Sequence, residues 1–109
     1  MAVEVTKDSF ETEVLAEEKP VLLDFWGPAC KPCLGLMPTV ERIAEKYDGK
    51  LKVAKVNAAQ NRRLCINLKV MSLPTFLVFS GGEEVDRLSG EVTAEEVEKL
   101  AARWADGGR

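Results

Sequence analysis

The feature that most restricts the fold of this chain is a run of six residues, Val21–Trp26, that is apolar at all but one position. A strand with one exposed face alternates between apolar and polar residues, whereas a strand covered on both faces does not. The run therefore predicts a central strand of a sheet with helices on both faces. Asp24 is the exception. Unless it lies solvated at the end of the sheet, burial of its carboxylate should raise its pKa.

Around this strand the apolar pattern alternates between strand and helix periods, which predicts an α/β fold of order βαβαβαββα. Helices between strands predict parallel pairing, and the turn 80–83 predicts an antiparallel hairpin. The expected strands are 3–5, 21–26, 51–57, 75–79 and 85–88. Four helices are expected. The first begins at a capping box of Asp8 and Glu11, and the second follows Cys33 and runs to about Tyr47 with a kink at Pro38. The third spans 61–67, and the fourth runs from a capping box of Thr93 and Glu96 to Gly107.

Length and charge exclude several classes of protein. A chain of 109 residues predicts one domain, 1–109, and the net charge of -3 gives no sign of a nucleic-acid or anionic-membrane partner. No apolar run approaches the ~20 residues that span a bilayer. Residues 1–7 lack the apolar segment of a signal peptide, so we expect a cytoplasmic protein.

The chain has no histidine and three cysteines. The absence of histidine excludes Ser–His and Cys–His nucleophile pairs and any zinc site that needs imidazole. A C-x-x-C pair can also supply half of the ligands of a metal site, or it can form an inert structural disulfide. A metal site needs four ligands, and Cys65 is the only other cysteine in the sequence. We therefore expect no metal, and the absence of a G-x-G-x-x-G motif predicts no bound nucleotide cofactor.

The pair Cys30 and Cys33 lies where the central strand ends and a helix begins. The free N–H groups and the dipole of a helix N-terminus stabilise an anion, and the thiolate is the attacking species in disulfide exchange. Lys31 adds a neighbouring positive charge, and Pro32 suits a first turn that needs no N–H donor. We predict that Cys30 is the exposed nucleophile and that Cys33 lies deeper.

Several further stretches occur in the order seen in a known family. They are Leu23-Asp24-Phe25-Trp26, the C-x-x-C, Met37-Pro38, Val53-Ala54-Lys55-Val56-Asn57, Gln60-Asn61, Leu73-Pro74-Thr75 and Gly90. On these residues the chain resembles the thioredoxin family over about residues 3 to 105. The resemblance implies the thioredoxin fold, a mixed central sheet with helices on both faces. It also implies an enzyme that reduces protein disulfides through Cys30 and Cys33.

The resemblance assigns a role to two charged residues. The position of Asp24 implies a carboxylate beneath the disulfide that helps to deprotonate Cys33. Lys55 has the side-chain parity of Leu51 and Val53, so it should point inward, and the resemblance implies that it approaches Asp24. The alternative is a lysine whose ammonium group reaches water.

The resemblance also implies a surface that binds the substrate. Pro74 matches a cis-proline that faces the disulfide and presents the backbone of Leu73 to the substrate. Gly90 and Trp26 would complete an apolar rim, although Trp26 also suits a plain core position. Cys65, in the short helix, is interpreted as a buried structural thiol.

Three residues depart from the usual Trp-Cys-Gly-Pro-Cys-Lys motif of the family: Ala29, Lys31 and Leu34. Ala29 removes a large aromatic side chain from the contact surface, and Lys31 places a charge between the cysteines. With Pro32, these two residues are expected to contact the substrate. These changes bear on the range of clients. The expected partners are disulfide-containing proteins and a reductase of the thioredoxin reductase type, with the protein a monomer. The alternatives are an oxidase or isomerase on the same fold and a non-catalytic module that binds a specific protein.

Overall fold

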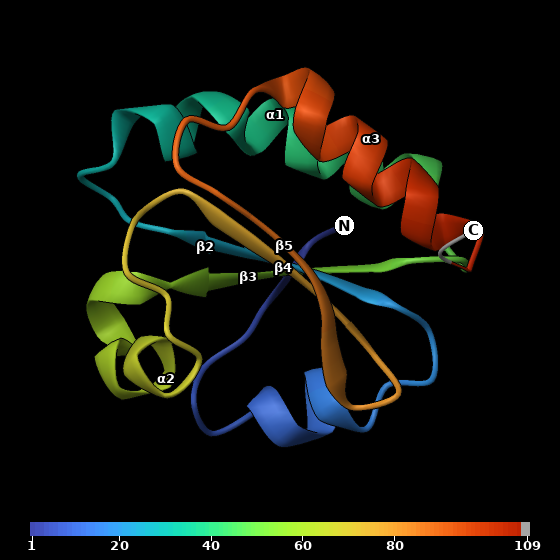
Figure 1. Ribbon diagram of the computed structural model, residues 1–109, viewed down its shortest axis with the longest axis horizontal. Coiled ribbons are helices and arrows are strands. Elements are labelled where there is room, and N and C mark those ends of the chain that lie inside the picture. Colours follow the sequence, from blue (N-terminus) through green and yellow to red (C-terminus); the bar gives the residue numbers. More distant parts are fainter. Residues whose placement is uncertain (108–109) are drawn as a thin grey trace.

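The computed structural model describes residues 1–107 and has a five-stranded mixed sheet between two layers of helices (Figure 1). Helices α1 and α3 cover one face of the sheet, and α2 and the N-terminal helix η1 cover the other. The strands are β1 (Val3–Glu4), β2 (Val21–Trp26), β3 (Lys52–Asn57), β4 (Thr75–Ser80) and β5 (Glu83–Ser89). The helices are η1 (Glu11–Leu15), α1 (Lys31–Lys46), η2 (Ala58–Gln60), α2 (Arg62–Asn67) and α3 (Ala94–Ala105).

The strand order is β1-β3-β2-β4-β5, which confirms β2 as the central strand. β3 lies parallel to both β1 and β2, whereas β4 lies antiparallel to β2 and β5. In this register Asp24 has Lys55 on one side and Phe76 on the other. The sheet therefore brings the odd carboxylate of the central strand next to a lysine far away in the sequence.

Two apolar cores fill the spaces between the sheet and its helices, as the two-sided apolar run predicted. The core beneath α2 and η1 includes Val5, Val14, Leu23, Phe25, Val56, Leu77 and Phe79. The core beneath α1 and α3 includes Leu22, Val40, Ile43, Val53, Phe76, Val78 and Val97. No helix among residues 1–107 is long and apolar enough to cross a membrane.

The predicted start of the first helix was wrong. The helix begins at Glu11, is a short π-helix, and has no side chain that caps its N-terminus. The residues before it form a separate turn instead, in which the hydroxyl of Ser9 accepts the N–H of Thr6. Packing fixes the helix, because the ring of Phe10 meets Phe79 edge to face at 5.5 Å between centroids.

The other helix boundaries follow the sequence closely. α1 ends at Lys46 with Pro38 inside it, although the kink expected there stays a prediction. The capping box of α3 is confirmed, because the Thr93 hydroxyl accepts the N–H of Glu96 at 3.1 Å and the Glu96 carboxylate accepts the N–H of Thr93 at 2.9 Å. The short turn η2 between β3 and α2 was not predicted.

Candidate active site

A disulfide joins Cys30 and Cys33 at the start of α1, with 5.2 Å between their Cα atoms. Cys30 is the N-cap residue of the helix, and its Sγ accepts the backbone N–H of Cys33 at 3.2 Å. That N–H is one of the donors that a helix N-terminus leaves unpaired. The donor and the helix dipole stabilise negative charge on Sγ, which is the charge that a thiolate nucleophile carries.

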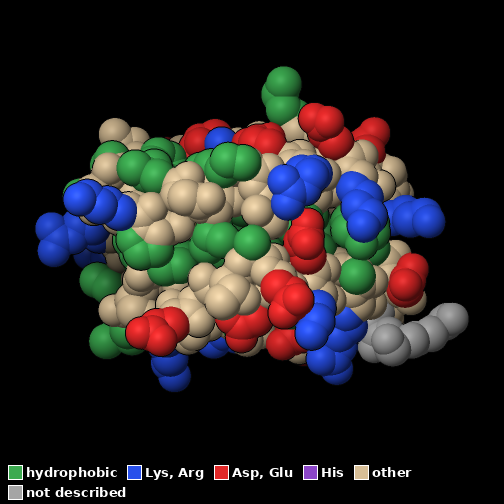
Figure 2. All heavy atoms as spheres, turned by 90° about the horizontal axis from the view of Figure 1, so that it is seen from above, with side chains coloured by type: hydrophobic (Ala, Val, Ile, Leu, Met, Phe, Trp, Pro, Cys, Tyr) green, Lys and Arg blue, Asp and Glu red, His purple; other side chains and the backbone are tan. Residues whose placement is uncertain are grey.

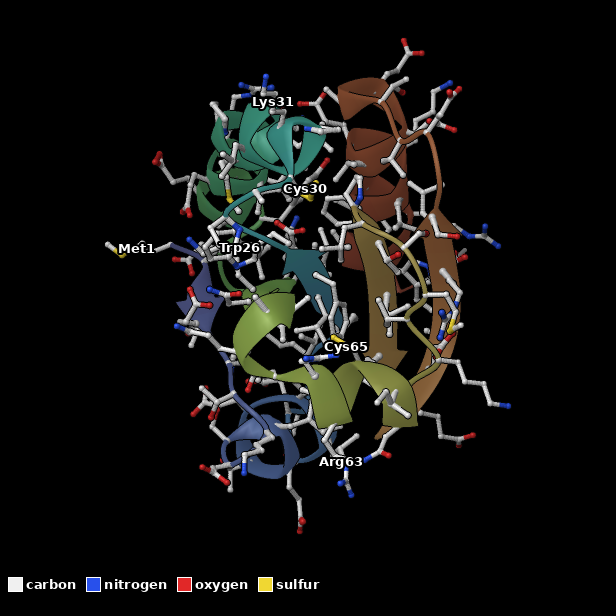
Figure 3. All side chains as sticks on the ribbon, turned by 90° about the vertical axis from the view of Figure 1, so that its left-hand side faces the viewer. Met1, Trp26, Cys30, Lys31, Arg63 and Cys65 are labelled. Carbon is white, nitrogen blue, oxygen red and sulfur yellow. A yellow bond between two sulfur atoms is a disulfide. The ribbon has the colours of Figure 1, made fainter. Side chains whose placement is uncertain are left out.

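The two sulfurs differ in their access to solvent. Cys33 is only 1% exposed, whereas Cys30 is half-buried and the adjacent Lys31 and Pro32 are exposed. Figure 3 shows Cys30 and Lys31 at the outer end of α1, with Trp26 below them. Of the two cysteines, Cys30 is therefore the one that lies closer to solvent.

Asp24 lies within the sheet on the side that faces α1, and it is 1% exposed. Neither of its carboxylate oxygens has a hydrogen-bond partner among the described residues. Burial raises the pKa of Asp24 to about 7, opposed by the ammonium group of Lys55 and assisted by the carboxylates of Glu4 and Glu41. A carboxylate with this pKa can accept and return a proton near neutral pH.

Lys55 points toward α1, as its parity predicted, but its ion pair is with a residue that the sequence did not single out. Its Nζ lies 3.2 Å from Oε2 of Glu41 on α1. Oε1 of Glu41 accepts the backbone N–H of Ala2 at 3.1 Å. Partial burial of Glu41 opposes ionisation, but the Ala2 N–H and Lys55 outweigh it and lower its pKa. No local pattern marked Glu41, because its two partners lie on distant segments of the sequence.

The peptide bond between Leu73 and Pro74 is cis, as the resemblance implied. These two residues line a groove of about 570 Å³ together with Pro32 and Gly90. The groove brings together four of the residues predicted to bind substrate, and Glu91, Val92 and Thr93 also line it.

A second hollow, of about 600 Å³, lies against Cys30 on the side of α2. We call it the alanine recess, because Ala29, Ala58 and Ala59 line it together with Leu73 and Arg62. Ala29 was predicted at the contact surface, whereas Ala58, Ala59 and Arg62 were missed. Leu73 lines the groove, the alanine recess and a third hollow beneath Met71.

Two residues expected to contact substrate, Trp26 and Lys31, line neither the groove nor the alanine recess. Trp26 is half-buried, and its indole N–H is enclosed without a partner among residues 1–107. Cys65 on α2 is a buried free thiol, as interpreted from the sequence, and burial raises its pKa. Across residues 1–107 no three Cys, His, Asp or Glu side chains group as metal ligands.

Comparison with known proteins decides the family. The family model for thioredoxin matches residues 1–103. The chain belongs to the thioredoxin family. It is 44% identical to thioredoxin 1 of Nostoc sp. over 91 residues, which cover 84% of this chain and 85% of that relative. It is 39% identical to a thioredoxin of Peptoclostridium acidaminophilum over 104 residues, 94% of each chain, and 40% identical to one of Porphyra purpurea over 101 residues.

Membership of the thioredoxin family, with the disulfide at Cys30 and Cys33, makes this protein a thiol–disulfide oxidoreductase. The family implies two kinds of partner: proteins that contain a disulfide and a reductase that returns the electrons. The prediction of the family, the fold and the chemistry from the sequence is confirmed.

Proposed function

We propose that this thioredoxin reduces protein disulfides with Cys30 as the nucleophile, Cys33 as the resolving thiol and Asp24 as the proton acceptor. One observation carries the assignment of Cys30. Cys30 is half-buried at the N-cap of α1 and its Sγ accepts the N–H of Cys33, whereas Cys33 itself is buried. The arrangement favours a thiolate at the only one of these two positions that a protein substrate can approach.

In the first step, the Cys30 thiolate attacks one sulfur of the client disulfide. A bond forms between Cys30 Sγ and that sulfur, the client S–S bond breaks, and the other client sulfur leaves as a thiolate that takes a proton. The backbone N–H of Cys33 stabilises the negative charge on Cys30 Sγ before the attack.

In the second step, Cys33 loses its proton to Asp24 and attacks Sγ of Cys30. The bond between Cys30 and the client breaks, and the second client sulfur leaves as a thiolate that takes a proton from solvent or from Asp24. The client has then gained two electrons, and the protein holds the disulfide between Cys30 and Cys33. Lys55 and Glu41 hold charges near Asp24 that tune how readily it accepts the proton.

We assign the protein the reducing direction, because Pro32 follows the pattern of the reducing members of the family. The electron donor in this proposal is an NADPH-dependent flavoprotein reductase of the thioredoxin reductase type. The proposal also includes one domain over residues 1–109, a monomer, a cytoplasmic location, and no membrane or nucleic-acid partner.

The test is reduction of insulin disulfides with dithiothreitol as the electron source. Wild-type protein should accelerate the reaction, and Cys30→Ser and Cys33→Ser should each abolish turnover. Cys33→Ser should also accumulate mixed disulfides at Cys30, which mass spectrometry of trapped complexes would detect. Stable capture of a partner without any turnover by the wild type would contradict the proposal.

A further inference from the structure

The alanine recess combines an apolar floor with one unpaired cation. Alanine side chains at positions 29, 58 and 59 and the side chain of Leu73 line it, and Cys30 forms part of its wall. Arg62 also lines it, and its guanidinium group makes no hydrogen bond or ion pair with any residue from 1 to 107. A hollow of about 600 Å³ is in the range that holds a bound group, between ~300 and 1,000 Å³.

The groove on the other side of the disulfide has the opposite charge. Its lining includes Glu91 and no cation, whereas the lining of the alanine recess includes Arg62 and no carboxylate. A substrate segment that lies across Cys30 therefore meets positive charge toward α2 and negative charge toward α3. The affinity of a client segment for each side therefore depends on how much apolar surface it buries there and on whether its charge is complementary.

From this geometry we infer that the alanine recess is a specificity subsite for clients whose attacked cysteine is flanked by a large aliphatic or aromatic residue and then by an acidic one. The apolar side chain fills the space above the three alanines, and the carboxylate meets the guanidinium group of Arg62. The inference rests on the proposed reduction of disulfides at Cys30 and specifies which disulfides react fastest. Alanine at these positions leaves the space that the client side chain occupies.

Symmetric peptide dimers test this inference, because either sulfur of such a disulfide has the same flanks. Three peptides carry the central sequences Glu-Leu-Cys-Leu-Glu, Glu-Gly-Cys-Gly-Glu and Lys-Leu-Cys-Leu-Lys. Each is oxidised to its disulfide-linked dimer. The rate constant for a single turnover by the reduced protein is measured by chromatography and divided by the rate constant with dithiothreitol alone, which removes the intrinsic reactivity of each peptide.

For wild-type protein we expect the Leu and Glu dimer to react about 5- to 10-fold faster than the Gly and Glu dimer, as partial burial of one leucine allows. Ala59→Gln fills the alanine recess with a polar side chain and should reduce this ratio to less than about 2. The control Ala16→Gln makes the same change at an exposed residue outside the lining of the alanine recess. It should leave the ratio unchanged.

Arg62→Glu tests the charge, with Arg63→Glu as a matched control on the next residue. Arg63 does not line the alanine recess, and in Figure 3 it points away from Cys30. Arg62→Glu should lower the preference for the Glu over the Lys dimer by about fourfold, and Arg63→Glu by less than twofold.

The outcomes separate this inference from the proposed function. Equal reduction of all three dimers, or an equal loss of charge preference in Arg62→Glu and Arg63→Glu, would overturn the subsite and leave disulfide reduction standing. A preference for leucine that survives Ala59→Gln would also overturn it. If the protein reduces none of the dimers, or reduces them equally well without Cys30 and Cys33, the proposed function is wrong and the subsite is wrong with it.

Discussion

Two helices carry the three cysteines of this protein, and they place these thiols in opposite environments. At the start of α1, Cys30 is half-buried and its sulfur accepts a backbone N–H. In α2, Cys65 is buried inside the helix, is a free thiol, and has its pKa raised by that burial. The same side chain thus has a hydrogen-bond donor that stabilises its anion in Cys30, and an apolar environment that disfavours its anion in Cys65.

The difference teaches that position along a helix, and not the residue type, sets the chemistry of a thiol. The first turn of a helix offers unpaired N–H donors, whereas the interior of a helix has already used them. The layer beneath each helix also differs, because α1 covers the buried carboxylate of Asp24. Four predictions test this contrast.

The largest effect is expected for Asp24→Asn. Removing a buried carboxylate without hydrogen-bond partners should stabilise the fold by about 3–4 kcal/mol at pH 8, and it should slow the attack of Cys33 on the mixed disulfide. Urea unfolding and the lifetime of a trapped mixed disulfide measure the two effects. Asp48→Asn, at an exposed carboxylate, is the matched control for net charge. A less stable variant that resolves at the normal rate would assign Asp24 a purely structural role.

The pH dependence of stability carries the same information. The pKa of Asp24 rises from 3.8 to about 7, so between these values the folded protein binds more protons than the unfolded chain. The stabilisation of the fold by protonated Asp24, measured as free energy of unfolding, is therefore complete below about pH 4 and is lost as the pH rises through about 7. Asp24→Asn should remove this fall in stability with rising pH.

The second prediction compares the thiols directly. In the reduced protein near neutral pH, Cys30 should react with iodoacetamide on the order of 100-fold faster than Cys65, since thiolate character and exposure both favour it. Cys33 should also react far more slowly than Cys30. Mass spectrometry of peptides after timed quenching measures the rates. Equal rates at Cys30 and Cys65 would remove the contrast between the two helices.

A smaller effect is expected for Cys65→Ala. The thiol behaves as a small apolar side chain in the core beneath α2, so its removal should cost about 1 kcal/mol of unfolding free energy. Insulin reduction should remain at the wild-type rate. A loss of activity in a folded variant would show that Cys65 takes part in the redox chemistry.

The smallest effect is expected for Lys31→Gly. A surface ammonium beside Cys30 favours its thiolate by about 1 kcal/mol or less after screening by solvent. Its removal should raise the titration midpoint of Cys30 by less than one pH unit and make the protein slightly more reducing, by about 20 mV or less. Thiolate absorbance and glutathione titration measure the changes, which should shrink in high salt. A shift of opposite sign would point to backbone geometry at position 31.

The sequence predicted the parts of this site that depend on local pattern. An apolar run interrupted by one carboxylate located the central strand and Asp24, and a cysteine pair before a helix located the disulfide at the start of α1. It did not identify Glu41, which meets Lys55 and Ala2 only because the fold brings distant segments together. Nor did it predict that three alanines and Arg62 would surround one hollow, since each is unremarkable alone in sequence.

The start of the first helix also depends on contacts that the local sequence pattern does not show. The spacing of Asp8 and Glu11 fits a capping box, but the turn from Thr6 to Ser9 and the packing of Phe10 on Phe79 move the helix start to Glu11. Local hydrogen-bonding preferences here yield to tertiary packing. Where no distant contact competes, as at Thr93 and Glu96, the same spacing predicted the cap correctly.

The position of Leu73, on the wall of the groove, the alanine recess and the hollow lined by Met71, has a consequence for how such a protein can diversify. A mutation at Leu73 alters every contact surface at once, so natural selection on one client would disturb the others. Ala59 and Gly90 each border a single hollow, and variation there can change one class of client at a time. New preferences are therefore expected to evolve at these outer residues, while Leu73 remains under the combined constraint of every partner.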